Sequence, residues 1–537
     1  MMCSVGKLLR WARHMRACTI TQIYIRKMME CHRFCFIILA VCTFSYGVVS
    51  TEVESRQPTP VTVDVDSSRV LFQVDPRLYS FGLGCSLHYK NHYNLSSPIL
   101  RSLSKELAPA YLRLGGTYCD FLTFEGEARE EYSKTFSNKT LTGEMWDELN
   151  SFVEDVGFQL VFDINVLLRT PENKWDPSNL EQLLDYNSKK GHKVNFQLGN
   201  EPNAFRLIAN ISITPEALAD DFKTLRTILK QRKLYQESLL IGPDTTSLVK
   251  HMNSDAKEYL QQFLDNIGDA VDVVSTHFYY RPLSKAEPVV NIFTDPSVLD
   301  QFLKNTVAFK ELVERHDPPN RPKLWYGETG LLPGGFFTVG GSGMNYSDRF
   351  ISGMVQLDKL GICASHGIEV MVRQTLLGPG HRNGRRLITD DYDPNPDYWS
   401  VVLYKRLVGV KSLKVTKFAA DTDGINRVRL YAHCTQTDRS KYGYKPGAVT
   451  VFGVNFSQQK PVQLLFNSNS VDQFLLTPAR TSNITSKYIA LNGHELSAIG
   501  GAIPDLPPQQ VSAKPLFPAG SMGFFVLKDA GFKICKT

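Results

Sequence analysis

The chain lacks the patterns that define the common metal-binding, nucleotide-binding and repeat proteins. Its histidines and acidic residues do not cluster at the spacing of metal ligands, so we expect neither a metal ion nor another cofactor. No P-loop or dinucleotide-binding glycine pattern is present, which excludes the usual phosphate-binding motifs. Low-complexity segments and internal repeats are also missing. The 537 residues are therefore expected to form large globular domains.

Net charge is absent as well once the first 50 residues are set aside. They hold seven basic and one acidic residue of the 60 and 54 in the chain, so 53 of each remain. The apolar run Phe34–Val49 follows a basic stretch ending at Arg33 and predicts a secretory signal peptide cleaved after Ser50. A signal anchor is the alternative, although about 16 apolar residues are short for a membrane span. Without a net charge, any binding of a polyanion must come from a local basic patch.

Few cysteines remain after this leader. There are five, an odd number, and a secreted chain tends to pair its cysteines and leave the odd one free. A Cys434–Cys535 disulfide is our first prediction, because it would tie the last residues to an upstream strand. A Cys85–Cys119 pair is the second and would leave Cys363 free.

Glycosylation sequons give a further sign of the secretory route. Six of them alongside a signal peptide favour a glycoprotein that is secreted or lysosomal. The predicted glycosylation sites are Asn94, Asn138, Asn210, Asn345, Asn455 and Asn483.

Strands and helices alternate through the middle of the chain. Eight near-continuous apolar strands indicate a parallel sheet buried on both faces. Eight such units over roughly 330 residues predict a (β/α)8 TIM barrel, which we place at residues 78–412. Short strands split by glycine, proline and asparagine turns follow and predict a β-sandwich at 413–537. Residues 51–77 are expected to join this sandwich, because 61–73 alternate in the same way.

Two glutamates carry the strongest functional signal. An apolar strand stops at Glu201 within Val194–Asn203, and another stops at Glu328 within Lys323–Thr329. Barrel enzymes place their chemistry at the carboxyl ends of strands, here the fourth and the seventh. Paired carboxylates cleave glycosidic bonds, and a separation of about 5–5.5 Å gives retention of configuration. We assign Glu201 as the general acid/base and Glu328 as the nucleophile.

Polar and glycine residues near these strand ends complete the expected site. Asn200 is placed to bond a sugar 2-hydroxyl, and a tyrosine hydroxyl at the end of the sixth strand is expected to hold Glu328 ionised. The basic run 381–386 follows the eighth strand and offers arginine forks for carboxylate or sulfate. The other substrate-binding candidates are Gly115, Gly116, Thr117, Arg206, His277, Tyr279, Arg281, Gly334, Gly335, Arg382 and Arg385.

Several segments together resemble the heparanase family, retaining endo-β-glucuronidases that cut heparan sulfate. They include Ala108–Thr117, Leu198–Asn203, Tyr326–Thr329, Gly367–Gln374 and Asp393–Trp399. The resemblance implies a (β/α)8 barrel with a β-sandwich and the two glutamate roles given above. It also implies a carboxylate-binding loop at Gly334 and Gly335, a glycine loop at Gly380, and a disulfide between Cys434 and Cys535.

The chain departs from that family in three places. Residues 125–157 are too few to hold the long excisable linker of the mammalian enzyme, so we expect a single-chain enzyme. The family's aspartate after the first strand falls near Gly84, and Thr245–Asp255 keeps only Lys250 and His251 of the basic residues that line the family's cleft.

Three functions are consistent with these observations. The leading hypothesis is an endo-β-glucuronidase acting as a monomer on heparan sulfate. A relative that cuts hyaluronan or trims terminal glucuronate is the second, and a polysaccharide-binding protein without catalysis is the third.

Overall fold

The computed structural model describes residues 57–85, 93–126, 139–249, 255–280, 289–316, 322–332, 346–378, 386–419, 426–439 and 441–536. Residues 58–537 form one compact unit, so the predicted boundary between barrel and sandwich stays a prediction. No helix in the described ranges is long and apolar enough to cross a membrane. The predictions that fall outside these ranges are the signal peptide 1–50, Asn138, Arg281, Gly334, Gly335, Asn345, Gly380, Arg382 and Arg385.

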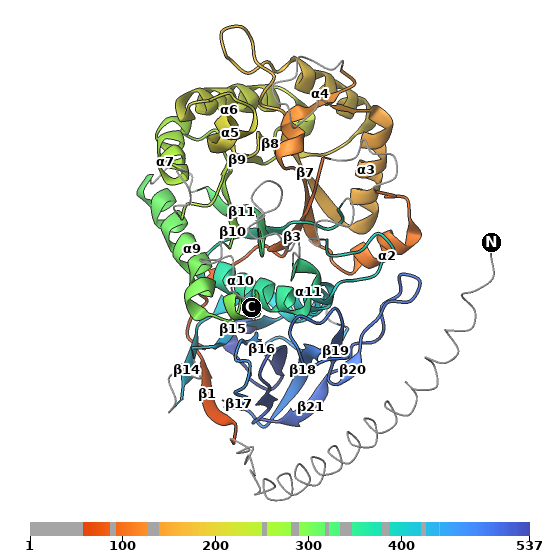
Figure 1. The fold of residues 1–537 in the computed structure, drawn as a ribbon, viewed down its shortest axis with the longest axis vertical. Helices are drawn as coiled ribbons and strands as arrows, with labels where there is room; N and C mark the ends of the chain where they lie inside the picture. The colour runs from red at the N-terminus through yellow and green to blue at the C-terminus, as the bar shows by residue number, and fades with distance from the viewer. Residues whose placement is uncertain are drawn as a thin grey trace, which may run out of the picture. The chain divides into compact units, whose positions relative to one another are not determined.

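Eight parallel strands close into a barrel, as the sequence predicts (Figure 1). Each strand is mostly apolar, and both of its faces are buried, one inside the barrel and one under the helices. In chain order the strands are β3 (Tyr79–Leu83), β4 (Ala110–Leu114), β7 (Phe158–Ile164), β8 (Asn195–Leu198), β9 (Leu240–Thr245), β10 (Val273–Tyr279), β11 (Lys323–Gly330) and β12 (Val370–Arg373).

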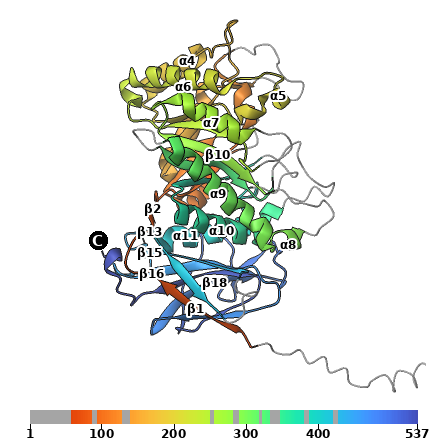
Figure 2. The same ribbon diagram turned by 90° about the vertical axis from the view of Figure 1, so that its left-hand side faces the viewer.

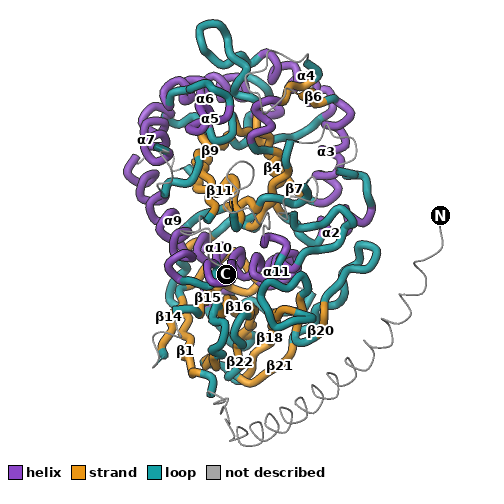
Figure 3. Tube along the Cα trace, viewed as in Figure 1, coloured by secondary structure: helices purple, strands orange, loops and turns teal. Residues whose placement is uncertain are grey.

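Helices surround the barrel and cover its outer face (Figure 3). Local signals set their ends: the Thr142 hydroxyl accepts a hydrogen bond from the Met145 amide at the start of α3, and Gly157 ends that helix in the left-handed conformation. The larger helices are α2 (Pro98–Lys105), α3 (Gly143–Val156), α4 (Ser178–Lys190), α6 (Pro215–Lys230), α7 (Ala256–Ile267), α9 (Pro296–His316), α10 (Phe350–His366) and α11 (Pro396–Leu407).

Two further sheets pack as a sandwich, and the amino-terminal strands belong to it as predicted. Strand β1 (Thr59–Val65) pairs with β14 (Val415–Phe418) on one side and with β17 (Val462–Phe466) on the other. Strand β2 (Phe72–Gln73) pairs with β13 (Val408–Leu413) at the edge of the nine-stranded sheet. The remaining strands are β15 (Val428–Thr435), β16 (Val449–Asn455), β18 (Ser470–Pro478), β19 (Ile489–Leu491), β20 (His494–Glu495), β21 (Gln509–Ser512), β22 (Leu516–Phe517) and β23 (Ser521–Leu527).

The central strands β16 and β23 of the nine-stranded sheet are buried on both faces, and this sheet joins the sandwich to the barrel. Along β16, Val449 and Val451 face the core between the two sheets, whereas Phe452 and Val454 belong to the core that contains α10 and α11. Figure 2 shows these two helices between the barrel and the sheet. Gly361 permits the close approach of α10, because a Cβ there would lie 2.1 Å from the Tyr431 ring.

The barrel interior has two layers of different chemistry. The lower layer is apolar, and the upper layer, nearer the carboxyl ends of the strands, is polar. Since side chains alternate along a strand, residues two apart point to the same side, here the barrel interior. The lower layer consists of Tyr111, Val161, Ile241, Val273, Trp325, Val370 and Val372. The upper layer consists of Arg113, Asp163, Gln197, Asp244, Ser275 and His277, all buried.

Both predicted disulfides are present. Cys434–Cys535 and Cys85–Cys119 each have a Cα–Cα distance of 5.3 Å and close segments of 101 and 34 positions. Cys363 is free and buried, as the second prediction implied.

The predicted glycan at Asn455 does not fit the folded chain. Its side chain is fully buried, and its amide nitrogen donates to the carbonyls of Lys460 and Phe517, each at 3.1 Å. A glycan attached to that nitrogen would need solvent access and would break both hydrogen bonds. The sequons that the structure leaves exposed are Asn94, Asn210 and Asn483.

Candidate active site

Glu201 lies just beyond the fourth barrel strand, in a tight turn. Its backbone is left-handed, with φ 53° and ψ 53°, a conformation that side chains other than glycine rarely adopt. The Glu201 amide donates to the Asp244 carbonyl at 3.1 Å, and its own carbonyl accepts from the Ala204 amide at 2.8 Å. These bonds hold the strained turn, and they leave the carboxylate 24% exposed at the carboxyl end of the barrel.

Glu328 lies within the seventh strand and is held more tightly. Its side chain is 12% exposed, one oxygen accepts from Arg113 Nη1 at 3.1 Å, and the other accepts from the Tyr279 hydroxyl. A cation and a hydroxyl donor both favour an ionised carboxylate. The prediction that a tyrosine hydroxyl at the end of the sixth strand contacts Glu328 is therefore confirmed, and Tyr279 supplies it.

His277 connects the two glutamates. It lies directly across from Glu328 in the pairing of β10 with β11. Its Nδ1 is 2.9 Å from Glu201 Oε1, and its Nε2 is 2.6 Å from Asp244 Oδ2. Burial of the ring opposes its charge, but the Asp244 carboxylate and the hydrogen bonds to Asp244 and Glu201 outweigh burial and raise the pKa of His277 to about 10.

This placement corrects the substrate-binding prediction for His277. The ring is 1% exposed, and both of its nitrogens face carboxylates of the protein. As an imidazolium it donates to Glu201 and to Asp244 and so fixes the Glu201 side chain. In this geometry it positions the Glu201 carboxylate.

Arg113 is the hub of the upper layer. Its guanidinium donates to Glu328, Asp244 and Asn200 at 3.1, 2.7 and 2.8 Å, and its Nε donates to Gln197 at 3.0 Å. Burial opposes ionisation of Asp244, yet the charges of His277 and Arg113 hold the pKa of that carboxyl well below its usual range. A continuous chain of contacts therefore runs from Glu201 through His277, Asp244 and Arg113 to Glu328.

Sequence reasoning missed Arg113 and Asp244. The available signal was one charged residue inside an apolar strand, Ala110–Leu114, and one at the end of β9. Gly115 accommodates the guanidinium, because a Cβ there would lie 2.4 Å from its central carbon.

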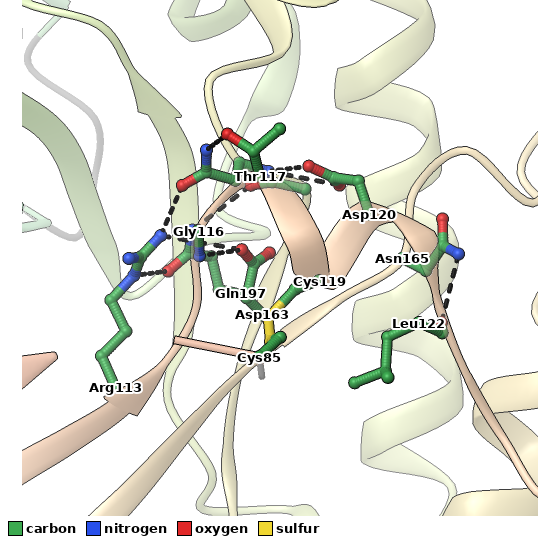
Figure 4. Close-up of a disulfide and its surroundings, with 12 residues drawn as sticks. Cys85, Arg113, Gly116, Thr117, Cys119, Asp120, Leu122, Asp163, Asn165 and Gln197 are labelled. Atoms are coloured by element: carbon green, nitrogen blue, oxygen red, sulfur yellow. Dashed lines mark hydrogen bonds and ion pairs between the residues drawn. A yellow bond between two sulfur atoms is a disulfide. The ribbon is translucent and has the colours of Figure 1, made fainter. Parts of the chain in front are cut away.

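The loop after β4 forms one wall of the site (Figure 4). Gly116 has φ 108°, and its amide donates to Asp163 Oδ2 at 3.2 Å. A Cβ at Gly116 would lie 3.9 Å from Glu328 Oε2, so the predicted glycine does border Glu328. Thr117 Oγ1 is 3.5 Å from Asn200 Nδ2. The Cys85–Cys119 disulfide fastens the short helix η2 (Thr117–Phe121) that continues this loop.

The remaining predicted residues divide between the buried network and the surface. Asn200 is 2% exposed and its oxygen accepts from Arg113. Arg206 lies on the short helix α5 (Phe205–Ile208), where its side chain is exposed. The described part of the chain contains no group of three or more His, Cys, Asp or Glu that could hold a metal ion.

A (β/α)8 barrel with two glutamates at the ends of its fourth and seventh strands, joined by a buried polar network, defines a glycoside hydrolase. Residues 84–361 match the family model described as "Glycosyl hydrolase family 79, N-terminal domain". The chain belongs to this family of glycosidases.

Known proteins are similar over most of the chain. Heparanase from Bos taurus is 32% identical over 529 residues, which covers 87% of this chain and 91% of that protein. Hyaluronoglucuronidase from Hirudo nipponia is 26% identical, and the match covers 89% of this chain and 99% of that protein. The crystal structure of a 4-O-α-L-rhamnosyl-β-D-glucuronidase from Fusarium oxysporum has a TM-score of 0.60 and 16% sequence identity. The match covers 87% of this chain and 100% of that chain, and it supports the fold alone.

Proposed function

We propose that the protein is a retaining endo-β-glucuronidase that cleaves heparan sulfate by double displacement. The observation that carries the proposal is the linked pair Glu201 and Glu328 at the ends of strands four and seven. The two carboxylates occupy different surroundings, as such a mechanism requires. The similarity to heparanases favours glucuronate as the sugar that is attacked.

In the first step Glu328 attacks the anomeric carbon while Glu201 acts as general acid. The Glu328–carbon bond forms as the glycosidic C–O bond breaks, and the leaving oxygen takes the proton of Glu201. Arg113 and Tyr279 keep Glu328 ionised and aim it before attack.

In the second step Glu201 acts as general base. Glu201 is ionised at this point, because the leaving oxygen has taken its proton. The ionised Glu201 takes a proton from water, whose oxygen bonds to the anomeric carbon as the ester bond breaks. The His277 imidazolium holds the Glu201 oxygen at 2.9 Å and limits its movement between the steps.

Polyanion binding must rest on local groups, because the chain after residue 50 is neutral. Gly334, Gly335 and Gly380 are proposed to bind the uronate through backbone amides, and Arg281, Arg382 and Arg385 to bind carboxylate or sulfate. Arg206 follows Glu201 by five positions and is exposed, so it is placed to contact a chain that extends past the acid/base.

A hyaluronan-cleaving enzyme is the second candidate. The hyaluronoglucuronidase relative matches 99% of its own length, so the same family supports that substrate. The few basic residues in Thr245–Asp255 favour a less sulfated glucuronan. An exo-acting glucuronidase is a third form of the same chemistry.

One assay separates these candidates. The purified protein is incubated with heparan sulfate and, separately, with hyaluronan, and the products are sized against the Glu328→Gln variant as a blank. Intermediate oligosaccharides from heparan sulfate alone support the proposal, and oligosaccharides from hyaluronan alone support the second candidate. Free glucuronate without oligosaccharides indicates exo action, and no product from either polymer contradicts the enzyme reading of the site.

We also propose that the protein follows the secretory route as a monomeric glycoprotein. The sequons at Asn94, Asn210 and Asn483 are exposed and supply the attachment sites. Peptide mass mapping of protein from a secreting eukaryotic cell tests this, with glycans expected at these positions and an unmodified Asn455.

A further inference from the structure

Lys359 of α10 reaches the end of the strand that carries Glu328. The side chain is fully buried. Its ammonium donates to the Thr329 hydroxyl and to the Gly330 carbonyl, both at 2.7 Å. Thr329 is the residue directly after Glu328, so the lysine holds the backbone next to the nucleophile from outside the barrel.

The Thr329 hydroxyl passes this contact to the neighbouring strand. It accepts from Lys359 and donates to the Phe278 carbonyl at 2.8 Å. Phe278 lies between His277, which positions Glu201, and Tyr279, which donates to Glu328. Through Thr329, Lys359 therefore links β11, which carries Glu328, to β10, which carries His277 and Tyr279.

The regular pairing of β11 with both of its neighbours is interrupted next to the residues that Lys359 contacts. The pairing of β10 with β11 shifts register between Thr276 and His277. The pairing of β11 with β12 shifts between Tyr326 and Thr329. A register shift re-aims side chains and interrupts the ladder locally, and Glu328 lies directly after the first shift and within the second. The Lys359 contacts begin at the next residue.

The stability of the core does not explain a charged residue at this place. Burying an ammonium is costly, and both hydrogen bonds go to neutral oxygens, so burial lowers the pKa of Lys359 to about 7. The rings of Phe278, Tyr280 and Phe302 lie 5.3, 4.8 and 5.1 Å from the ammonium and offset part of that cost. An apolar side chain of similar length would fill the space without the cost, but it would leave Thr329 and Gly330 untied.

We propose that Lys359 is a positioning residue for Glu328. It fixes the end of β11 through Thr329 and Gly330, and the end of β10 through Phe278, so that the nucleophile keeps its contacts with Arg113 and Tyr279. The inference rests on the proposed double displacement, because it assigns Lys359 to the step in which Glu328 attacks.

The test measures that step alone. A 2-deoxy-2-fluoro-β-D-glucuronyl fluoride traps the nucleophile of a retaining glucuronidase as a stable ester, and mass spectrometry gives the trapping rate. We expect Lys359→Met to slow trapping about 10- to 100-fold, because small displacements of reacting groups cost rates of this order. The KM for polymer should change less than about threefold, since binding groups elsewhere are intact.

Lys405→Met is the matched control. Lys405 is buried on α11, and its ammonium donates to the Pro109 carbonyl at 2.6 Å, before the start of β4. Lys405 is therefore a buried lysine like Lys359, but it binds the chain at the amino-terminal ends of the barrel strands, away from Glu328. Its variant should trap at the wild-type rate, within about threefold, even where its melting temperature falls. Equal slowing in both variants would show a general loss of rigidity and would overturn the inference.

Thr329→Val supplies a second route to the same contact. It removes the hydroxyl but keeps the shape, so it should slow trapping as Lys359→Met does, and the double variant should be no slower than the slower single variant. Wild-type rates in a folded Lys359→Met, or multiplied losses in the double variant, would overturn the inference. If the Lys359 variant fails to fold, a wild-type rate in Thr329→Val overturns it alone. A wild type that is never trapped would instead contradict double displacement itself.

Discussion

The two layers inside the barrel share several strands and are equally buried, but they differ in chemistry. Tyr111 and Arg113 are two residues apart on β4, and Val161 and Asp163 are two apart on β7. All four are at most 2% exposed. The lower layer is apolar packing that stabilises the barrel, whereas the upper layer places charges where burial is expensive. Burial alone therefore does not show whether a residue of the barrel interior serves stability or catalysis. The chemical identity of the buried side chain does.

Removing Glu328, the proposed nucleophile that the upper layer holds through Arg113, should have the largest effect on activity. We expect Glu328→Gln to lower kcat by about 10⁴-fold or more, because the covalent step is lost. The amide keeps the shape of the side chain, so the melting temperature should stay within a few degrees. Polymer cleavage measured against the wild type checks this. Activity above about 1% of the wild type would contradict the assignment.

The acid/base variant should lose activity selectively. Glu201→Gln should lower cleavage of the polymer by about 10²- to 10⁴-fold, the range of general acid catalysis. An aryl glucuronide with a good leaving group needs no proton in the first step, so a burst of phenol should remain in this variant. Stopped-flow absorbance measures the burst. Equal loss with both substrates would argue against Glu201 as the acid.

The variants Arg113→Met and Val273→Ala compare the upper layer with the lower layer. Stability and kcat are measured for each. Loss of the guanidinium removes one of the two cations that face buried Asp244 and also the donor to Glu328, which should cost about 3–5 kcal/mol of unfolding free energy and about 100-fold in kcat. Val273→Ala in the lower layer should cost about 1–3 kcal/mol and leave kcat within twofold. Denaturant unfolding and kinetics on the same preparations give both numbers. A large fall in kcat from Val273→Ala would erase the distinction between the layers.

Asp163→Asn should show the smallest effect and one that depends on pH. Burial raises the pKa of Asp163 to about 7, although Arg113 opposes the shift, so the folded state holds a proton that the unfolded chain releases near pH 4. Wild-type stability from this group is full below about pH 4 and is lost as the pH rises through 7. The advantage of the Asn variant in melting temperature should therefore grow between pH 4 and 7.

The control for this prediction is Asp220→Asn, whose carboxylate is 76% exposed on α6. Its melting temperature relative to the wild type should not change over the same range. A difference for Asp163→Asn that stays constant from pH 4 to 8 would show that Asp163 is ionised throughout.

The sequence predicted the barrel and both glutamates for physical reasons. Strands buried on both faces read as apolar runs, and Glu201 and Glu328 each end such a run. The sandwich and the two disulfides followed from turn residues and from cysteine positions.

The connections between elements were harder to predict. Arg113 is one charge in an apolar strand, and a linear pattern does not show that it meets Glu328, 215 positions later. The position of His277 at a strand end predicts a substrate contact, but the sequence does not show that Asp244 lies against its ring. The sequon at Asn455 predicts a glycan, but a sequon does not show that both faces of β16 are covered.

The configuration of the first product tests the central claim, that Glu201 and Glu328 act as a retaining pair. Proton NMR of a defined heparan sulfate oligosaccharide, recorded in the first minutes of cleavage, distinguishes the anomers at the new glucuronate reducing end before they equilibrate. The account predicts that the β-anomer appears first and that the α-anomer grows in later by mutarotation. An α-anomer that appears first would contradict it.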